Sequence, residues 1–260
     1  MATYKKRGYK KPTKKEEDFL EPEVAYDGES TTEEVFNTLN ESASRTEEWV
    51  ASNQKYILGG IGAIVLVVLG YLGYQQFVVK PKALEADNEI FYAQQYFNEA
   101  VNSTAKDSLY NIALNGADGK YGLLDIIDNY SGTPAANLAH YSAGMAYLNT
   151  QKYDEAIKYL QDFKSDDIIL NALAKGGIGD AFVQLGQDKD GLEYYEKAIA
   201  ISENAFTTPK FLFKAGVVSL EAGDADKALK YFNRVKNEYS DSEEGRTIDI
   251  YIGKAETLKK

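Results

Sequence analysis

The side chains that most often carry out chemistry are nearly missing from this chain of 260 residues, which has no cysteine and one histidine, His140. Without cysteine there is no thiol nucleophile, no thiolate zinc site and no disulfide. One histidine cannot make a two-histidine metal site, and any Ser-His-Asp triad would have to use His140. His140 falls where an internal repeat places a large residue on a helix, so we expect it to be packed in the core.

Two acidic pairs, Asp125 with Asp128 and Asp166 with Asp167, are the remaining candidates for acid–base chemistry. Nothing around them indicates a pocket, and such pairs are typical of a helix N-cap or a solvated helix face. No motif for a nucleotide, a metal or a nucleophile accompanies them. We therefore expect a binding protein rather than an enzyme, with no catalytic residue, no metal, no cofactor and no small-molecule substrate.

Three stretches of the C-terminal region share one pattern of small and large residues. They open at Gly144, Gly179 and Gly216, and the openings are 35 and 37 residues apart. In each, a small residue follows 12 positions later, a large one 16 positions later and an apolar one 19 positions later. This is the spacing of the tetratricopeptide repeat (TPR), and this part of the chain resembles TPR proteins. The small residues would lie where helices A and B of a repeat cross, with the large residues beside the crossing.

The resemblance implies an all-α fold, in which a TPR-like α-solenoid of helix pairs fills residues 82–260. Clear repeats are expected to start near residues 137, 172 and 209, and Pro209 suits the first turn of a helix. Before them, helical periodicity predicts a degenerate repeat with an insertion, and after them a helix that covers the apolar end of the solenoid. The ranges of these helices are 83–103, 107–115 and 121–131 before the repeats, and 242–258 after them.

A TPR array has a concave face lined by its A helices, and here that face is more apolar than a solvated groove. The eight groove residues expected to bind a partner are Leu138, Tyr141, Met145, Asp180, Gln184, Lys210, Phe213 and Val217. The other helix positions that usually face such a groove hold Leu148, Asn149, Leu173, Gly176, Val183, Leu220 and Glu221. Three alternatives stay open: the protein's own helix covers this face, the array curves too little to form a groove, or a partner segment binds there, such as an amphipathic helix or an unfolded stretch. The groove has no cluster of Lys and Arg, so we do not expect it to bind a C-terminal carboxylate.

The net charge of −11 is distributed unevenly along the chain. Residues 1–15 carry seven basic side chains and no acid, residues 16–55 carry twelve acids against two bases, and residues 80–260 carry 28 acids against 20 bases. The basic arm is either a solvated tail or a segment that lies at the cytoplasmic lipid surface. Because the rest of the chain is acidic and would repel phosphate, we expect no nucleic-acid partner.

Between these charged regions, residues 56–74 are uncharged and mostly apolar. As a helix they would span about 28 Å, close to the hydrocarbon thickness of a bilayer. Aromatic residues flank the run at both ends, where interfacial side chains are common, and the run begins too late and is too long for a signal peptide. The sequence therefore predicts a single transmembrane helix over 54–79, an amphipathic helix over 31–53 and a disordered tail over 1–30.

The basic cluster precedes the apolar segment, which favours a cytoplasmic N-terminus and a TPR domain on the extracytoplasmic side. A cytoplasmic TPR scaffold with the inverse topology is the alternative. Gly59 and Ala63 form a small-xxx-small pair that could pack against another membrane helix. The expected location is the cytoplasmic (inner) membrane, as a single-pass protein with a periplasmic TPR domain and the lipid bilayer as one partner.

A basic tail, one membrane helix and an extracytoplasmic TPR domain together resemble the ancillary TPR subunit of the bacterial Sec translocon. The resemblance covers residues 50–260 and includes the blocks Asn137-Leu138-Ala139 and Tyr153-Asp154-Glu155-Ala156-Ile157. It implies association with translocon subunits and with a membrane-anchored prolyl-isomerase chaperone. The chain departs from that family in its N-terminal arm of 55 residues and in the insertion Asp107–Gly119. The alternative is a TPR scaffold for another envelope assembly, such as cell division or outer-membrane secretion.

Overall fold

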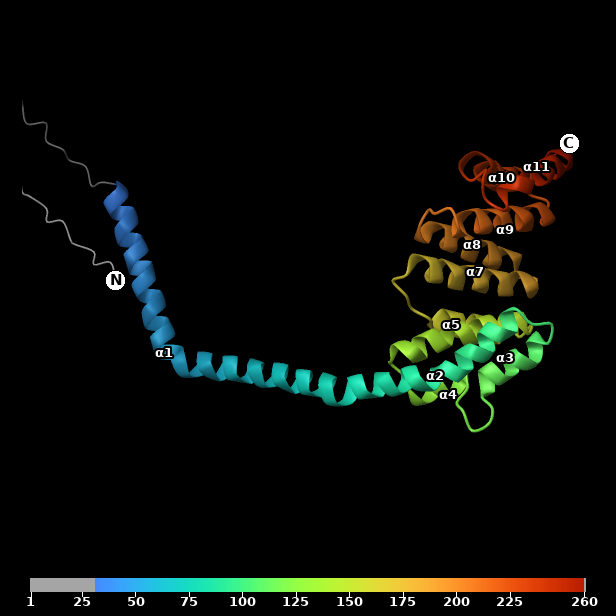
Figure 1. The fold of residues 1–260 in the computed structure, drawn as a ribbon. Helices are drawn as coiled ribbons and strands as arrows, with labels where there is room; N and C mark the ends of the chain where they lie inside the picture. Colours follow the sequence, from blue (N-terminus) through green and yellow to red (C-terminus); the bar gives the residue numbers. More distant parts are fainter. Residues whose placement is uncertain (1–30, 260) are drawn as a thin grey trace, which may run out of the picture. The chain divides into compact units, whose positions relative to one another are not determined.

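The computed structural model describes residues 31–259, with side chains from residue 44 onward, so the tail expected over residues 1–30 lies outside the described residues. The chain divides into two compact units, residues 1–67 and 68–260, and each is described by itself. Within the described range every regular element is a helix, and the only β-bridge joins Ala117 to Lys120 (Figure 1). The predicted all-α fold class is confirmed.

The first helix, α1, runs over Thr31–Tyr74, so the expected helix over 31–53 and the apolar segment that follows belong to one continuous helix. Every residue from Leu58 to Leu72 is exposed. Among the described residues, one helical run, Ser44–Val101, is long and apolar enough to cross a membrane, and none of its most apolar stretch is buried. Gly59 and Ala63 are exposed, and a Cβ on Gly59 would meet no atom within 4 Å. Their packing on another membrane helix stays a prediction.

A π-helical turn, η1 (Gln75–Val79), connects α1 to α2 (Lys80–Val101) without a loop. In this turn the backbone N–H of Lys80 donates to the carbonyl of Gln75, five residues back. Pro81 gives a physical reason for the wider turn, because its ring has no N–H and clashes with a carbonyl four residues back in a regular α-helix. Helical structure therefore continues from the apolar segment into the first helix of the C-terminal unit.

The helix α2 packs against α3 (Lys106–Asn115), α4 (Leu123–Asn129) and the first helix of the repeats, α5 (Pro134–Asn149). Its buried face carries Ala86, Ile90, Ala93 and Ala100. Two side-chain hydrogen bonds join it to later segments: Tyr130 Oη donates to Glu85 Oε1 at 3.0 Å, and Gln94 Nε2 donates to Ser142 Oγ at 2.8 Å. These contacts make α2 an integral part of the helical stack.

Three antiparallel helix pairs follow, and they stack in chain order (Figure 1). The helices are α5 with α6 (Tyr153–Asp162), α7 (Ile168–Gln184) with α8 (Asp188–Ile201), and α9 (Thr207–Glu221) with α10 (Ala225–Glu238). A short 3₁₀ turn, η2 (Gly245–Thr247), leads into α11 (Ile248–Leu258), which packs on α10. The end helix expected from residue 242 thus becomes an α-helix only at Ile248.

The helices of each pair cross at the glycine that opens the repeat pattern. A Cβ on Gly144 would lie 2.5 Å from Leu160 Cγ, one on Gly179 would lie 2.7 Å from Tyr195 Cδ1, and one on Gly216 would lie 2.6 Å from Phe232 Cδ1. In all three pairs the crowding side chain is the large residue 16 positions after the glycine. The glycines are therefore required by close packing, because any side chain would overlap the facing helix.

The turns inside the three pairs share one backbone conformation. Gln151, Gly186 and Gly223 have φ angles of 62°, 72° and 80°, in the left-handed region. In all three turns the residue after the left-handed position donates its N–H back into the preceding helix, from Lys152 to Tyr147, from Gln187 to Phe182 and from Asp224 to Ser219, each at 2.9 Å. Glycine adopts this conformation without steric cost, whereas an L-residue pays about 1–2 kcal/mol.

We therefore expect Gln151→Gly to stabilise the protein by about 0.5–1 kcal/mol, because the relieved strain exceeds the entropy that glycine adds to the unfolded chain. Urea unfolding of the full-length protein in detergent micelles measures the change. The reverse substitution, Gly186→Gln, serves as the matched control and should destabilise by about 1 kcal/mol. A loss of stability in Gln151→Gly would contradict this description of the first turn.

Candidate binding groove

The A helices α5, α7 and α9 line an open groove with a volume of about 610 Å³. This lies within the range of roughly 300–1,000 Å³ that is typical of binding pockets. Eleven of its lining residues come from these helices and one, Tyr195, comes from α8. The residues are Met145, Leu148, Asn149, Asp180, Val183, Gln184, Tyr195, Phe213, Lys214, Val217, Val218 and Glu221.

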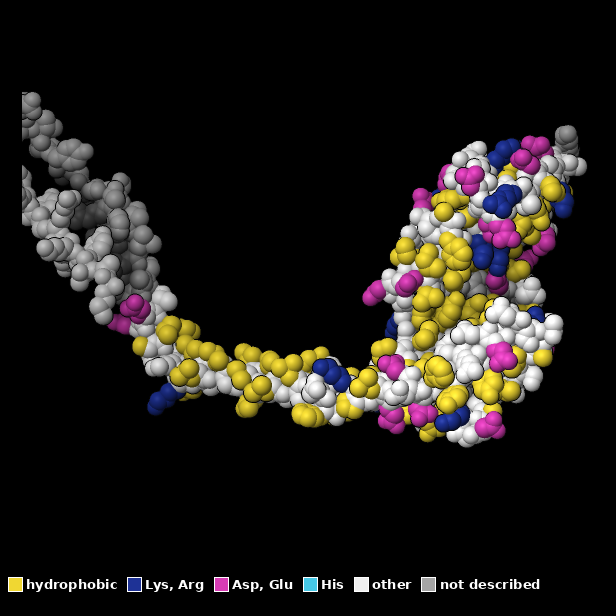
Figure 2. Space-filling view, viewed as in Figure 1, with side chains coloured by type: hydrophobic (Ala, Val, Ile, Leu, Met, Phe, Trp, Pro, Cys, Tyr) yellow, Lys and Arg dark blue, Asp and Glu magenta, His cyan; other side chains and the backbone are white. Residues whose placement is uncertain are grey.

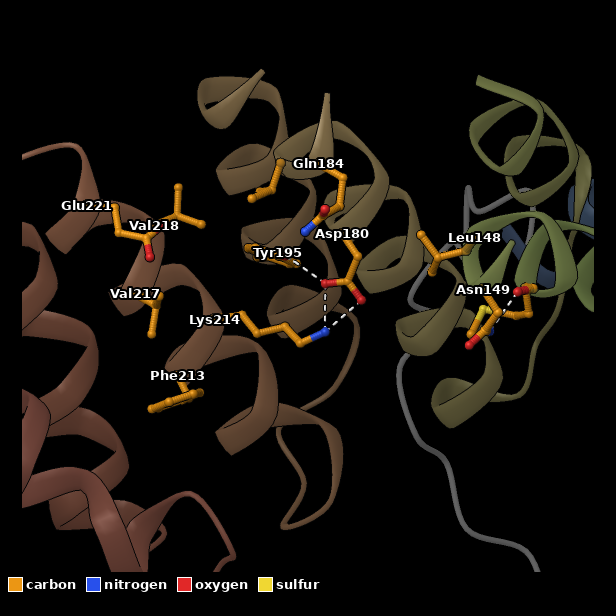
Figure 3. Close-up of a pocket in the computed structure, with 12 residues that line it drawn as sticks. Leu148, Asn149, Asp180, Gln184, Tyr195, Phe213, Lys214, Val217, Val218 and Glu221 are labelled. Atoms are coloured by element: carbon orange, nitrogen blue, oxygen red, sulfur yellow. Dashed lines mark hydrogen bonds and ion pairs between the residues drawn. The ribbon is translucent and has the colours of Figure 1, made fainter. Parts of the chain in front are cut away.

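Hydrophobic side chains make up half of the groove lining, and Figure 2 shows such side chains gathered along the stacked repeats. The polar groups lie in two places: a charged pair at the centre and the last residues of the A helices (Figure 3). A concave surface that combines apolar side chains with placed polar groups is typical of a binding site.

At the centre of the groove, Lys214 of α9 reaches Asp180 of α7 (Figure 3). Lys214 Nζ lies 2.6 Å from both carboxylate oxygens of Asp180, and Tyr195 Oη donates to Asp180 Oδ1 at 2.7 Å. Tyr195 is buried, and this burial, together with the nearby Asp180 carboxylate, raises the pKa of its hydroxyl. The three side chains join the second repeat to the third and leave no uncompensated charge at the centre.

Five of the eight groove residues predicted from the sequence line this groove: Met145, Asp180, Gln184, Phe213 and Val217. The other three lie elsewhere. The Tyr141 ring packs on Phe163, with ring centroids 5.2 Å apart, and lies partly buried against the core between the first two repeats. Leu138 is 38% exposed and does not line the groove. Lys210 lines an adjoining hollow beside Phe213, and its Nζ lies 5.4 Å above the Phe206 ring.

Sequence reasoning did not select Tyr195, Lys214 and Val218. Tyr195 was expected only at the helix crossing, and its hydroxyl extends past the crossing to the groove. Lys214 follows Asp180 by 34 residues, about one repeat length. Opposite charges one repeat apart are therefore the sequence signal that could have revealed this pair.

The last helix partly covers one end of the groove. The Tyr251 ring of α11 contacts the Phe213 ring edge-on, with centroids 4.7 Å apart, and both rings pack near Phe232. Phe213 therefore contributes to the seam between α9 and α11 as well as to the groove. Val217, one turn further along α9, lines the groove without such a ring contact among those described and is the cleaner position for a test substitution.

His140 lies outside the groove, half-buried beside Tyr159, with ring centroids 5.9 Å apart. Its Nδ1 atom is buried and has no hydrogen-bond partner within the described part of the chain. Burial lowers the pKa of His140, partly opposed by Asp162 and reinforced by Lys158. Among the described residues no three His, Asp or Glu side chains are grouped as a metal site.

A lowered histidine pKa makes the folded state bind fewer protons than the unfolded state. We therefore expect the free energy of unfolding to be highest above pH 6.5, the ordinary pKa of histidine, and to decrease as the pH falls toward the lower pKa of His140 in the folded state. His140→Phe should remove this loss and keep the ring contact with Tyr159. Because the chain has one histidine, an NMR titration of its imidazole reads the pKa directly. A value at or above 6.5 would contradict the assignment.

Two sequence comparisons match this region. Family models described as tetratricopeptide repeats match residues 139–163, 174–204 and 211–242. A TPR repeat-containing protein of Methanocaldococcus jannaschii is 27% identical over 214 residues, which is 77% of this chain. The chain spans about a third (31%) of the length of that relative.

Two solved structures are similar at low identity. The first is a crystal structure of nearly identical TPR-like repeats from a Podosopora anserina protein named for the kinesin light chain. It has a TM-score of 0.48 and 11% identity, and the match covers 67% of this chain and 86% of that one. The MamA protein gives a TM-score of 0.42 at 15% identity and covers 67% of this chain and 91% of that one.

The matched segments fall on the helix pairs described above. The first contains most of α5 and all of α6, the second contains most of α7 and all of α8, and the third contains most of α9 and all of α10. Repeats of this kind typically serve as non-catalytic scaffolds that bind other proteins. The pairs α5–α6, α7–α8 and α9–α10 are tetratricopeptide repeats.

Proposed function

We propose that this protein is anchored in a membrane by α1 and binds a segment of another protein in the groove between α5, α7 and α9. The observation that carries the proposal is the groove itself, which is open, half apolar and lined by all three A helices. The concave face of a stacked-repeat array is the surface that such proteins use for binding. The exposed apolar run in α1 supports the anchoring, because an exposed stretch of this length is stable in lipid rather than in water.

We further propose that the bound partner belongs to the Sec protein translocon and that the protein is an ancillary, chaperone-associated subunit. In this arrangement the N-terminus is cytoplasmic and the repeats are on the periplasmic side of the inner membrane. Translocon subunits and a membrane-anchored prolyl-isomerase chaperone would be the partners. Support comes from the order of the segments, a basic arm followed by one apolar helix and TPR repeats, and from the basic cluster on the N-terminal side.

Affinity purification of the full-length protein from native membranes tests this role. We expect translocon subunits to be recovered with the wild type and to be lost with Val217→Asp, because a carboxylate in the groove would be left without a partner. The matched control is Asn233→Asp on the exposed face of α10, which should leave recovery unchanged. Recovery of other envelope components in place of translocon subunits would support the alternative, a scaffold for another envelope assembly.

The proposed topology has its own test in spheroplasts. A protease added from outside should digest the repeats and leave the N-terminal arm protected by the membrane. Protection of the repeats in intact spheroplasts, with digestion only after lysis, would show the inverse topology and exclude a periplasmic role.

A further inference from the structure

The groove has a negative end, which is formed by the last residues of its three A helices. The helices α5, α7 and α9 end at Asn149, Gln184 and Glu221, and all three of these residues line the groove. A helix C-terminus carries a partial charge of about −0.5. None of the three helices has a basic residue in its last turn to offset this charge. We call this part of the groove, at Asn149, Gln184 and Glu221, the carboxyl end.

Acidic residues beyond the carboxyl end increase its negative charge. Residues 149–155, 184–190 and 221–227 lead from the A helices into α6, α8 and α10, and together they contain seven acids and three lysines. The N-termini of α6, α8 and α10 bring positive partial charges to this edge, but each is already matched by acids in its own first turn. Those acids are Asp154, Glu155, Asp188, Asp190 and Asp226.

Two of the three lysines at this edge interact with other groups. Lys152 Nζ lies 5.7 Å above the Tyr147 ring, and Lys227 Nζ lies 3.4 Å from Glu196 Oε1. Glu221 is exposed, and no ion pair within the described residues involves it. Lys259, the residue after α11, pairs with Asp226, so one of the seven acids is neutralised from outside these segments. The six other acids still outnumber the three lysines, and the carboxyl end keeps a net negative charge that a bound group could neutralise.

The rest of the groove does not compete for a basic group. At the centre, Asp180 is already bonded to Lys214 and Tyr195. At the opposite border, the hollow beside Phe213 is lined by two lysines, Lys210 and Lys214, and by two glutamates, Glu243 and Glu244, so neither sign of charge is in excess there. The apolar side chains of the groove and its negative carboxyl end are the two features that a ligand would have to match.

We propose that the occupant of the groove is an amphipathic protein segment that carries apolar side chains and, at one end, Lys or Arg. The apolar side chains would contact Met145, Val183 and Val217, and the basic group would lie at the carboxyl end. Charge at one end fixes the direction in which the segment binds, whereas apolar contacts alone do not. This inference rests on the proposed function, because it names the kind of segment that the same groove binds.

The two methionines of the chain, Met1 and Met145, provide a direct readout. In full-length protein labelled with ¹³C-methyl methionine and held in nanodiscs, Met145 reports on the groove and Met1 is the internal control. The probes are two short amphipathic peptides of Leu, Ala and Gln that differ only at one end, with two lysines or two glutamates. Titration of the Met145 signal measures the affinity of each peptide. We expect the lysine peptide to bind at least tenfold more tightly than the glutamate peptide, and this difference to fall as the salt concentration rises.

Two substitutions locate the charge effect. Glu221→Gln should weaken binding of the lysine peptide by about two- to fivefold, which is the range of an exposed ion pair. Gln184→Lys, which places a basic residue at the carboxyl end, should weaken the binding of the lysine peptide and strengthen the binding of the glutamate peptide. Glu193→Gln on α8, outside the groove, is the matched control and should change neither affinity.

The outcomes separate this inference from the proposed function. If both peptides shift Met145 with equal affinity, and Glu221→Gln has no effect, the groove binds protein segments but without a basic preference, and the inference fails alone. If neither peptide shifts Met145, the groove does not bind such segments, and both the inference and the proposed function of the groove fail.

Discussion

Gly216→Ala is expected to destabilise the repeats by about 1–3 kcal/mol, although it adds only one methyl group. The new Cβ would lie 2.6 Å from Phe232 Cδ1, and Phe232 is fully buried. The ring packs near Phe213 and Tyr251, so it cannot move aside without disturbing α9 and α11. Thermal unfolding followed by circular dichroism should show the melting temperature fall by several degrees.

The matched control is the same substitution at Gly253 in α11. There a Cβ would meet no atom within 4 Å, so alanine should bring only its higher helix propensity, a gain of about 0.5–1 kcal/mol. The two identical changes are therefore expected to have opposite signs. Equal effects at both positions would mean that the glycine at the helix crossing is not required by packing.

The proposed anchoring by α1 predicts that Leu66→Lys combined with Leu69→Lys removes the protein from the membrane. Both leucines lie in the exposed apolar run of α1, with 71% and 59% of their surface accessible. Each change from leucine to lysine at the centre of a membrane helix costs about 3–4 kcal/mol, and two such changes prevent stable insertion. Extraction of membranes with alkaline carbonate should release the variant and leave the wild type in the pellet.

Release could follow from the loss of the α1 anchor or from lysine at any exposed apolar position. A second pair of substitutions separates these two explanations. Ile250 and Leu258 of α11 are 62% and 53% exposed, similar to the two leucines. Ile250→Lys combined with Leu258→Lys should leave the protein in the membrane, because α11 belongs to the repeat domain. Release of both double variants, or of neither, would contradict the assignment of α1 as the anchor.

The repeat pairs could be predicted from the sequence because their main constraint is local. A glycine at each helix crossing and a large side chain 16 positions later reflect the fixed geometry of one helix pair, so the pattern recurs at Gly144, Gly179 and Gly216. The predicted helices over 107–115 and 121–131 correspond to α3 and α4 within two residues at each end.

The groove was harder to predict because it depends on how successive pairs stack. Tyr141 and Leu138 belong to an A helix, as the prediction required, but the Tyr141 ring packs on Phe163 against the core. The pair of Asp180 and Lys214 links residues of different repeats, which no local pattern contains. Continuity of α1 with α2 was missed for a local reason, since a proline at residue 81 usually separates two helices, and here a π-helical turn accommodates it.

Photocrosslinking from the groove in native membranes tests the central claim most directly, that the TPR groove binds another protein. A photoreactive residue would replace Gln184, which is exposed in the groove, or Asn233, which is exposed on α10. We expect Gln184 to crosslink to one protein partner, the yield to fall with Val217→Asp, and Asn233 to give no such product. Equal crosslinking from both positions, or crosslinking from Asn233 alone, would show that the groove is not the binding site.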